Sequence, residues 1–436
     1  MTTKRKSRAG YFRSLLSFLL ILLILALTRA LFIFVSLGAP IYDWQWYIGI
    51  ICILILILLR VFRILHGFKL FIIILSILIL WIVPGYFGFW RKRHLDLTDS
   101  PHLRISYWTG SGIIRTSNRI LGDLNATSST LYISIGRNEF DGEYTNSLVK
   151  GIRRIAGYNV PVYLCPRASD FVSLPVYGEW AENVRSAVQL VRRENLQNVH
   201  GIIGDVEKPY ISPWGFFAPR SDELSDMISS QEKLIRYIQR EHSDLEIGIT
   251  AFIWLYLDDC DEDADLSGIL KTTANPLQEW DFINVMTYSS FFPSSWRPYF
   301  VYLVEKVISN QLPQKRTSYL IGLIGKAGVG EPLMEPGDIV RDARIIRATG
   351  AEEVIVYQLI PAVQRYGDDF VKNIYGRVNN SIGKEVIVPF SRPVSLMVYG
   401  ILLADVILAL LSYKGIIVLL LLMAWMALFR FFRFAR

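Results

Sequence analysis

The stretch His200-Gly201-Ile202-Ile203-Gly204-Asp205-Val206-Glu207 begins as an apolar run typical of a buried strand and ends in two acids spaced i, i+2. Successive side chains alternate across a strand, so Asp205 and Glu207 are expected on one face. Two carboxylates at the end of an apolar strand cost desolvation free energy unless they are paired or used. The stretch therefore predicts a buried strand with a candidate site at its carboxyl end.

The composition of the 436-residue chain changes along its length. Overall, 52% of the residues are hydrophobic and 19% are charged, below the roughly 25% of ordinary soluble domains. The apolar excess lies in residues 11–90 and 394–429, and the part between them has an ordinary globular composition. We therefore expect membrane segments on either side of one large soluble domain, with boundaries at 1–94, 95–385 and 386–436.

Five apolar runs account for the expected membrane segments, because about 20 apolar residues suffice to span a bilayer. They are residues 11–37, 46–65, 70–90, 394–411 and 415–429. The last run is short and ends in arginine and phenylalanine, which also suits a helix lying in the membrane interface. The flanking positive charges lean toward a cytoplasmic N-terminus. The apolar runs predict a multi-pass membrane protein in a lipid bilayer, and the charges predict that the soluble domain lies on the extracytoplasmic side.

Charge and cysteine content exclude several other classes of protein. The net charge of +7 gathers beside the apolar runs, where it suits lipid headgroups, so no nucleic-acid partner is expected. The three cysteines have no CxxC spacing and only five histidines are present, so neither a zinc site nor a disulfide framework is indicated. We expect no metal and no cofactor, and the sequence leaves the oligomeric state open.

Short apolar runs rich in β-branched or aromatic residues alternate with helix-like stretches in the soluble part. The expected strands are 104–108, 131–135, 160–164, 199–206, 246–253, 281–287, 319–324 and 353–357. The expected helices are 115–123, 143–156, 179–194, 221–241, 299–310, 336–348 and 361–374. This alternation predicts an α/β fold of the (β/α)8 TIM-barrel type. The alternative is a doubly wound open sheet, but Thr109-Gly110-Ser111-Gly112 lacks the GxGxxG spacing of a phosphate-binding turn.

The barrel predicts where a site would lie, because active sites form at the carboxyl ends of barrel strands. Asp205 and Glu207 stand at that end of the fourth strand. Tyr288 follows the sixth strand, in which Asn284 and Met286 alternate with it and can share the barrel interior. Aromatic surface beside carboxylates suits a sugar, whose apolar faces stack on aromatic rings. Five further candidates lie at the ends of other strands: Tyr107, Trp108, Arg137, Tyr357 and Gln358.

Two motifs resemble glycoside hydrolase family 18, which includes chitinases, endo-β-N-acetylglucosaminidases and related lectins. The family motif on the fourth strand is DxxDxDxE, of which this chain keeps Asp205 and Glu207. Its sixth strand commonly reads close to DFINVMTYD, and this chain has Asp281-Phe282-Ile283-Asn284-Val285-Met286-Thr287-Tyr288. Tyr357 occupies about the place of the family's strand-eight tryptophan. The chain departs from the motifs at His200, Ile203 and Ser289.

The resemblance implies a chitinase-like glycosidase that cleaves a glycan of N-acetylated amino sugars. Glu207 would be the general acid, and Asp205 would orient the 2-acetamido group that serves as nucleophile. Tyr288 would hydrogen-bond the acetamido carbonyl. Substrate-binding roles are expected for Tyr107, Trp108, Arg137, Asn284, Met286, Tyr357 and Gln358. The alternative is a non-catalytic glycan-binding barrel or a scaffold of a membrane assembly, because the first two aspartates of the motif are absent.

Overall fold

The computed structural model describes the greater part of residues 92–389 and short parts of the apolar ends. The described residues are 19–20, 23–33, 47–48, 50–57, 92–98, 100–141, 144–167, 177–205, 222–253, 256, 279–311, 316–323, 334–380 and 385–411. The chain divides into two compact units. One comprises 92–259 and 266–389, and the other comprises 1–91, 260–265 and 390–436.

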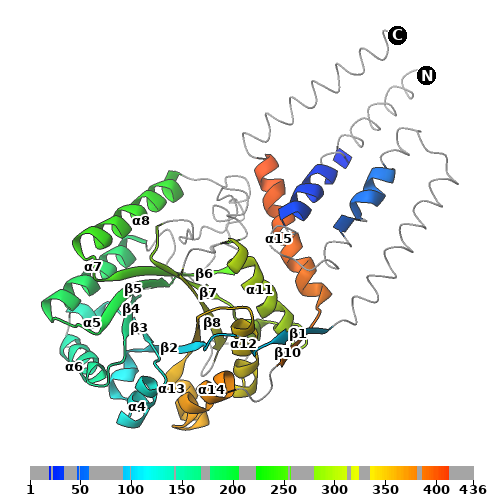
Figure 1. Ribbon diagram of the computed structural model, residues 1–436. Coiled ribbons are helices and arrows are strands. Elements are labelled where there is room, and N and C mark those ends of the chain that lie inside the picture. The colour runs from blue at the N-terminus through cyan, green and yellow to red at the C-terminus, as the bar shows by residue number, and fades with distance from the viewer. Residues whose placement is uncertain are drawn as a thin grey trace, which may run out of the picture. The chain divides into compact units, whose positions relative to one another are not determined.

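Eight parallel strands close into a barrel in the order of the sequence (Figure 1). They are β2 (Arg104–Gly110), β3 (Leu131–Ile135), β4 (Val162–Pro166), β5 (Val199–Asp205), β6 (Glu246–Phe252), β7 (Phe282–Met286), β8 (Arg316–Leu323) and β9 (Glu353–Tyr357). Strand β9 pairs with β2, which closes the sheet. The predicted TIM-type barrel is therefore confirmed, and the doubly wound open sheet is excluded.

Helices follow the strands and lie on the outside of the closed sheet (Figure 1). They are α4 (Asn118–Ala126), α5 (Asn138–Asp141), α6 (Thr145–Ala156), α7 (Tyr177–Arg193), α8 (Asp222–Glu241), α11 (Arg297–Gln311), α12 (Pro336–Ala348), α13 (Leu359–Tyr366) and α14 (Phe370–Asn379). A short 3-10 helix, η1 (Ser111–Arg115), follows β2. The helix expected over 361–374 is two helices. The first of them, α13, ends at Gly367, whose φ of +89° is favourable for glycine and strained for other residues.

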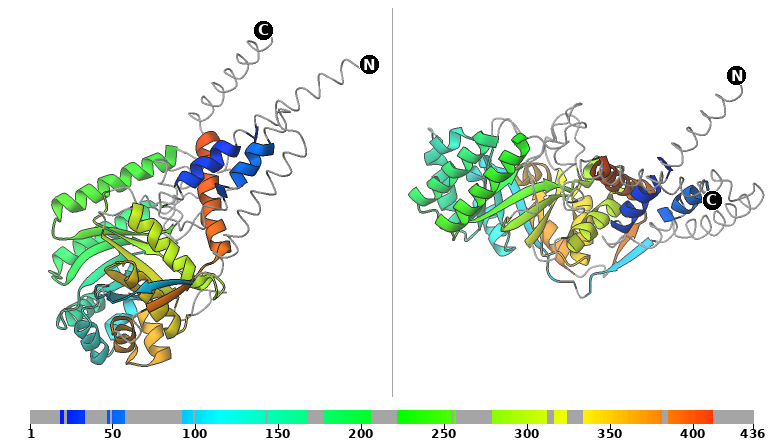
Figure 2. Two further views of the ribbon diagram at one scale, coloured as in Figure 1. Left: turned by 45° about the vertical axis from the view of Figure 1, so that its right-hand side comes forward. Right: turned by 90° about the horizontal axis from the view of Figure 1, so that it is seen from above.

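The two ends of the barrel unit meet in a small antiparallel sheet that was not predicted from the sequence. Strand β1 (Lys92–Asp96) pairs with β10 (Glu385–Pro389), with His94 opposite Ile387. The two strands run side by side in both views of Figure 2 as well as in Figure 1. Chain segments nearly 300 residues apart are thus joined by backbone hydrogen bonds, which a local reading of sequence does not reveal.

Aromatic rings fill the barrel interior, and glycines on neighbouring strands make room for them. A Cβ atom added at Gly248 would lie 2.3 Å from the ring of Phe282, and one added at Gly201 would lie 2.9 Å from that of Tyr163. The rings of Tyr163 and Phe282 meet edge to face with centroids 5.0 Å apart. The interior is therefore a packed core, as in other barrels of this type.

The second unit contains helical segments from both ends of the chain, including α15 (Arg392–Leu411). Tyr399 of α15 stacks on Tyr47 with centroids 3.6 Å apart and donates a hydrogen bond to the carbonyl oxygen of Leu27 at 2.9 Å. The predicted spans 70–90 and 415–429 lie outside the described residues, and the other three lie partly outside them. Among the residues that are described, no helix has the length and apolarity that crossing a membrane requires.

Candidate functional site

Asp205 is the last residue of β5 and faces the barrel interior. It alternates with Ile203, which is fully buried in the interior cluster of apolar side chains. Side chains two apart share a face of a strand, so Asp205 points to the same side at the carboxyl end. Glu207 lies outside the described residues, and its position beside Asp205 remains a prediction.

A row of polar side chains continues from Asp205 across the neighbouring strands. Asp205 pairs in register with Thr250 of β6, which pairs with Asn284 of β7 and then Ser318 of β8. Each alternates with apolar residues of the interior cluster, so the whole row faces inward. Thr250 is not among the residues predicted from the sequence, although its alternation with Phe252 along one strand marks it as an inward residue.

The amide of Asn284 lies wholly inside the barrel. The side chain is fully buried, and within the described part of the chain neither its oxygen nor its nitrogen has a hydrogen-bond partner. The hydroxyl of Thr250 is in the same situation. A buried polar group without a partner costs about 1–3 kcal/mol. Internal hydrogen bonds therefore do not account for Thr250, which pairs in register with Asp205, or for Asn284 on the following strand.

Aromatic rings line the carboxyl end of the barrel between β9, β2 and β7. The ring centroid of Tyr357 lies 6.4 Å from that of Trp108 and 6.2 Å from that of Tyr288. The indole nitrogen of Trp108 donates to the Ser134 hydroxyl at 2.8 Å, which fixes its ring. Trp108 is 1% exposed and Met286 2%, whereas Tyr357 is half-buried. Tyr357 thus presents the accessible part of this aromatic wall, and Trp108 and Met286 support it from within.

Tyr107 does not lie in the barrel interior, where a substrate-binding residue is expected. It is fully buried on the outer face of β2, where its ring meets Phe370 of α14 edge to face at 6.3 Å. Burial raises the pKa of its hydroxyl well above the usual value. Trp108, its neighbour, takes the inner face because adjacent side chains of a strand point to opposite sides. We therefore leave Tyr107 out of the candidate site.

Arg137 and Gln358 both lie at the carboxyl end of the barrel, as expected. Arg137 follows β3 and has an exposed side chain. Gln358 follows β9, is half-buried, and stands at the N-cap position of α13. The peptide bond between Tyr357 and Gln358 is cis. Contact of either side chain with a substrate remains a prediction.

A cavity of about 660 Å³ opens at the opposite, amino-terminal end of the barrel. Its charged lining residues bind one another. Glu353 accepts two hydrogen bonds from Arg104, at 3.1 and 3.0 Å, and one from Ser318 at 2.7 Å. Glu246 accepts from Arg316 and from the hydroxyl of Tyr163. Because these charges are already paired, the cavity indicates a stabilised barrel floor, and the candidate site stays at the other end.

No protein-family model matches the chain, and no curated protein sequence matches it. Several solved structures are similar to it. One is a GH18 chitinase from Pseudoalteromonas aurantia, with 14% identity and a TM-score of 0.45, over 63% of this chain and 99% of that chain. Another is the PgaB (BpsB) glycoside hydrolase domain from Bordetella bronchiseptica, with 12% identity and a TM-score of 0.42, over 64% and 99%.

A third similar structure is the exo-beta-1,4-mannosidase Op5Man5 from Opitutaceae bacterium strain TAV5, with 11% identity and a TM-score of 0.40, over 66% of this chain and 62% of that chain. These likenesses are too distant to assign a site or a substrate to this chain. The class of protein is defined by the strand order itself, which is that of a (β/α)8 barrel.

Proposed function

We propose that the protein is a glycoside hydrolase that acts on a glycan of N-acetylated amino sugars. The observation that carries the proposal is the inward-facing polar row of Asp205, Thr250 and Asn284 beneath the aromatic residues Tyr357 and Tyr288 at the carboxyl end of the barrel. Aromatic faces beside acidic and amide groups suit a sugar ring that carries polar substituents. The two sequence motifs that resemble glycoside hydrolase family 18 provide the second support.

In the proposed mechanism, Glu207 donates a proton to the leaving glycosidic oxygen as general acid. Asp205 orients the 2-acetamido group, whose carbonyl oxygen attacks the anomeric carbon in a substrate-assisted reaction. Tyr288 donates a hydrogen bond to the same carbonyl. The bond from the anomeric carbon to the leaving oxygen breaks as the carbonyl oxygen attacks, which gives a cyclic oxazolinium intermediate. A water molecule then attacks the anomeric carbon, opens the ring and gives a proton to the Glu207 carboxylate, which restores the acid.

The test is hydrolysis of β-linked N-acetylglucosamine oligomers by the purified full chain and by Glu207→Gln. Loss of a general acid lowers turnover by about 10²- to 10⁴-fold, whereas the neutral amide should leave glycan affinity largely intact. Asp205→Asn should also lower turnover. Full activity of Glu207→Gln on the oligomers would refute the proposed mechanism.

The second candidate is a barrel that binds the same glycan without cleaving it. The observation that favours it is Ile203, which is fully buried where the resembled motif has an aspartate next to Asp205. A carboxylate without that neighbour lacks one means of sharing a proton. Calorimetric binding of the oligomers without release of reducing ends from the wild-type protein would establish this candidate over the hydrolase.

We also propose that residues 1–91 and 390–436 attach the barrel to a lipid bilayer, with the barrel on the extracytoplasmic side. Large apolar side chains of this unit are exposed, including Phe32 at 75%, Leu19 at 52% and Leu396 at 52%. Several exposed apolar side chains in one unit are compatible with contact with the hydrocarbon interior of a bilayer. The proposal predicts that the chain stays in the membrane pellet after alkaline carbonate washing. Release into the supernatant would contradict it, and protease protection in sealed vesicles decides the side.

A further inference from the structure

Tyr288 stands where the chain leaves the barrel and enters the helix layer. The backbone nitrogen of Thr287 still donates to the carbonyl of Leu320 on β8, at 2.8 Å. The next residues form the short 3-10 helix η5 (Ser289–Phe291). The Tyr288 ring belongs to the interior cluster, whereas the side chain of Ser289 is fully buried among the helices. The direction of Tyr288 therefore depends on how η5 is held.

Helix α12 holds the beginning of η5 through a buried carboxylate. The hydroxyl of Ser289 donates to Oδ2 of Asp342 at 2.5 Å. The other oxygen of Asp342 accepts two hydrogen bonds from the Arg341 guanidinium, at 2.8 and 2.7 Å. Asp342 is fully buried, and burial raises its pKa although Arg341 and Ser289 act in the opposite direction. Ser289 and Arg341 are therefore the groups that compensate this carboxylate for its lost hydration.

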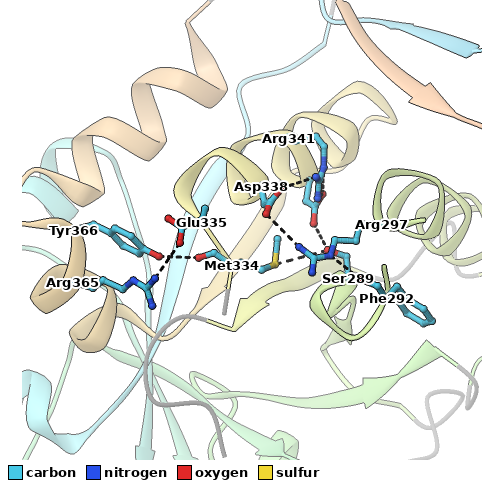
Figure 3. A network of polar contacts seen from close by, with 10 residues as sticks. Ser289, Phe292, Arg297, Met334, Glu335, Asp338, Arg341, Arg365 and Tyr366 are labelled. Carbon is cyan, nitrogen blue, oxygen red and sulfur yellow. Dashed lines mark hydrogen bonds and ion pairs between the residues drawn. The ribbon is translucent and has the colours of Figure 1, made fainter. Parts of the chain in front are cut away.

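The same helix holds the end of η5 through a second carboxylate (Figure 3). Arg297 donates to the carbonyl oxygen of Phe292 at 2.9 Å and to Oδ2 of Asp338 at 3.3 Å. Asp338 also accepts from Arg341 at 2.6 Å. Arg341 thus joins Asp338 to Asp342, and the two ends of η5 are tied to adjacent turns of α12.

We propose that Asp342 and Asp338 are positioning residues for Tyr288, acting through Ser289 and Arg297 to fix the direction of its ring. Ser289, the residue after Tyr288, departs from the resembled family motif. Its hydroxyl points away from the barrel interior and toward α12. Ser289 therefore cannot contact a substrate, and instead it anchors Tyr288, which can. The inference rests on the proposed function only for the identity of the substrate.

The test uses the full chain with 3-fluorotyrosine incorporated at position 288 and compares Ser289→Ala, Asp342→Asn and the double variant. We expect the fluorine resonance to shift or broaden in each. A displacement of about 1 Å can cost up to about 10²-fold in rate. We therefore expect kcat on N-acetylglucosamine oligomers to fall by about tenfold or more, while KM changes less. Because one hydrogen bond joins the pair, the double variant should resemble the single variants.

The matched control is Arg365→Ala, which removes the 3.1 Å ion pair with Glu335 at the exposed start of α12 and does not touch η5. Its resonance and kcat should equal those of the wild type. A lower melting temperature in Ser289→Ala and Asp342→Asn, with the resonance and kcat unchanged, would overturn the proposal. If the wild type shows no turnover, the proposed function fails, and the fluorine resonances alone still decide whether the anchor exists.

Discussion

Arg316 and Glu246 form a two-pronged ion pair at the amino-terminal end of the barrel, with Nη1–Oε1 at 2.7 Å and Nη2–Oε2 at 2.6 Å. The Arg316 guanidinium also lies over the Phe282 ring, 4.8 Å from its centroid. Asp205, by contrast, stands at the other end of β5. The charged groups that close the barrel floor are therefore separate from those proposed to act on a substrate.

This pair should make part of the barrel's stability depend on acid pH. Burial by itself would raise the pKa of Glu246, but hydrogen bonds from Arg316 and Tyr163 outweigh it and hold the pKa below the usual 4.5. A carboxyl with a lowered folded-state pKa stabilises the fold above about pH 4.5 and loses that contribution as the pH falls through its folded value. Thermal unfolding from pH 3 to 7 should show a smaller acid-side decline for Glu246→Gln than for wild type. Equal declines would argue against this assignment.

Glu305 of α11 should lower stability at neutral pH. Its side chain is 1% exposed, and burial raises its pKa from 4.5 to about 7, with Lys306 acting in the opposite direction. Between these two values the unfolded chain gives up the proton and the folded chain keeps it, so stability falls as the pH rises. The shift corresponds to about 3 kcal/mol above pH 7. Denaturant unfolding should show Glu305→Gln more stable than wild type at pH 8 and similar to it near pH 4. Curves that run parallel across this range would contradict the prediction.

Asn284→Leu separates a structural role of this residue from a functional one. The buried amide has no partner among the described residues, so a leucine of similar shape should leave the free energy of unfolding unchanged or raise it by about 1–3 kcal/mol. If the amide belongs to the site, turnover of the oligomers should fall in the same variant. The paired measurement is chemical denaturation and hydrolysis rate. Marked destabilisation would show that the amide has a structural partner.

Tyr357→Ala and Tyr107→Phe test whether the glycan binds at the carboxyl end of the barrel or on the outer face of β2. Tyr357 is half-buried at the mouth, and loss of its ring should raise KM about tenfold, because one stacking contact contributes roughly 1–3 kcal/mol. Tyr107 faces Phe370 outside the barrel, and its hydroxyl has no partner in the described part of the chain. Tyr107→Phe should therefore leave KM unchanged and slightly raise the melting temperature. The reverse pattern would place the glycan elsewhere.

The eight strands could be predicted from sequence because each is a short apolar run whose own residues favour a strand. The same holds for the inward face of Asn284, Met286 and Tyr288, which follows from alternation along a single strand. Tyr107 and Trp108 show where this reading ends. Adjacent side chains of a strand point to opposite faces, so either Tyr107 or Trp108 must face outward, and their residue types do not determine which of them does. The contact with Phe370, more than 250 positions away in the sequence, decides it.

The sequence by itself determined the barrel class, the carboxyl-end position of Asp205 and the aromatic residues near it, because periodicity and strand order are local properties. Only the tertiary structure decided the polar row from Asp205 to Asn284, the anchoring of Ser289 by Asp342, and the pairing of β1 with β10. Each of these joins segments that are far apart in the chain. Their partners are selected by the closure of the sheet and by the cost of burying an unpaired polar group.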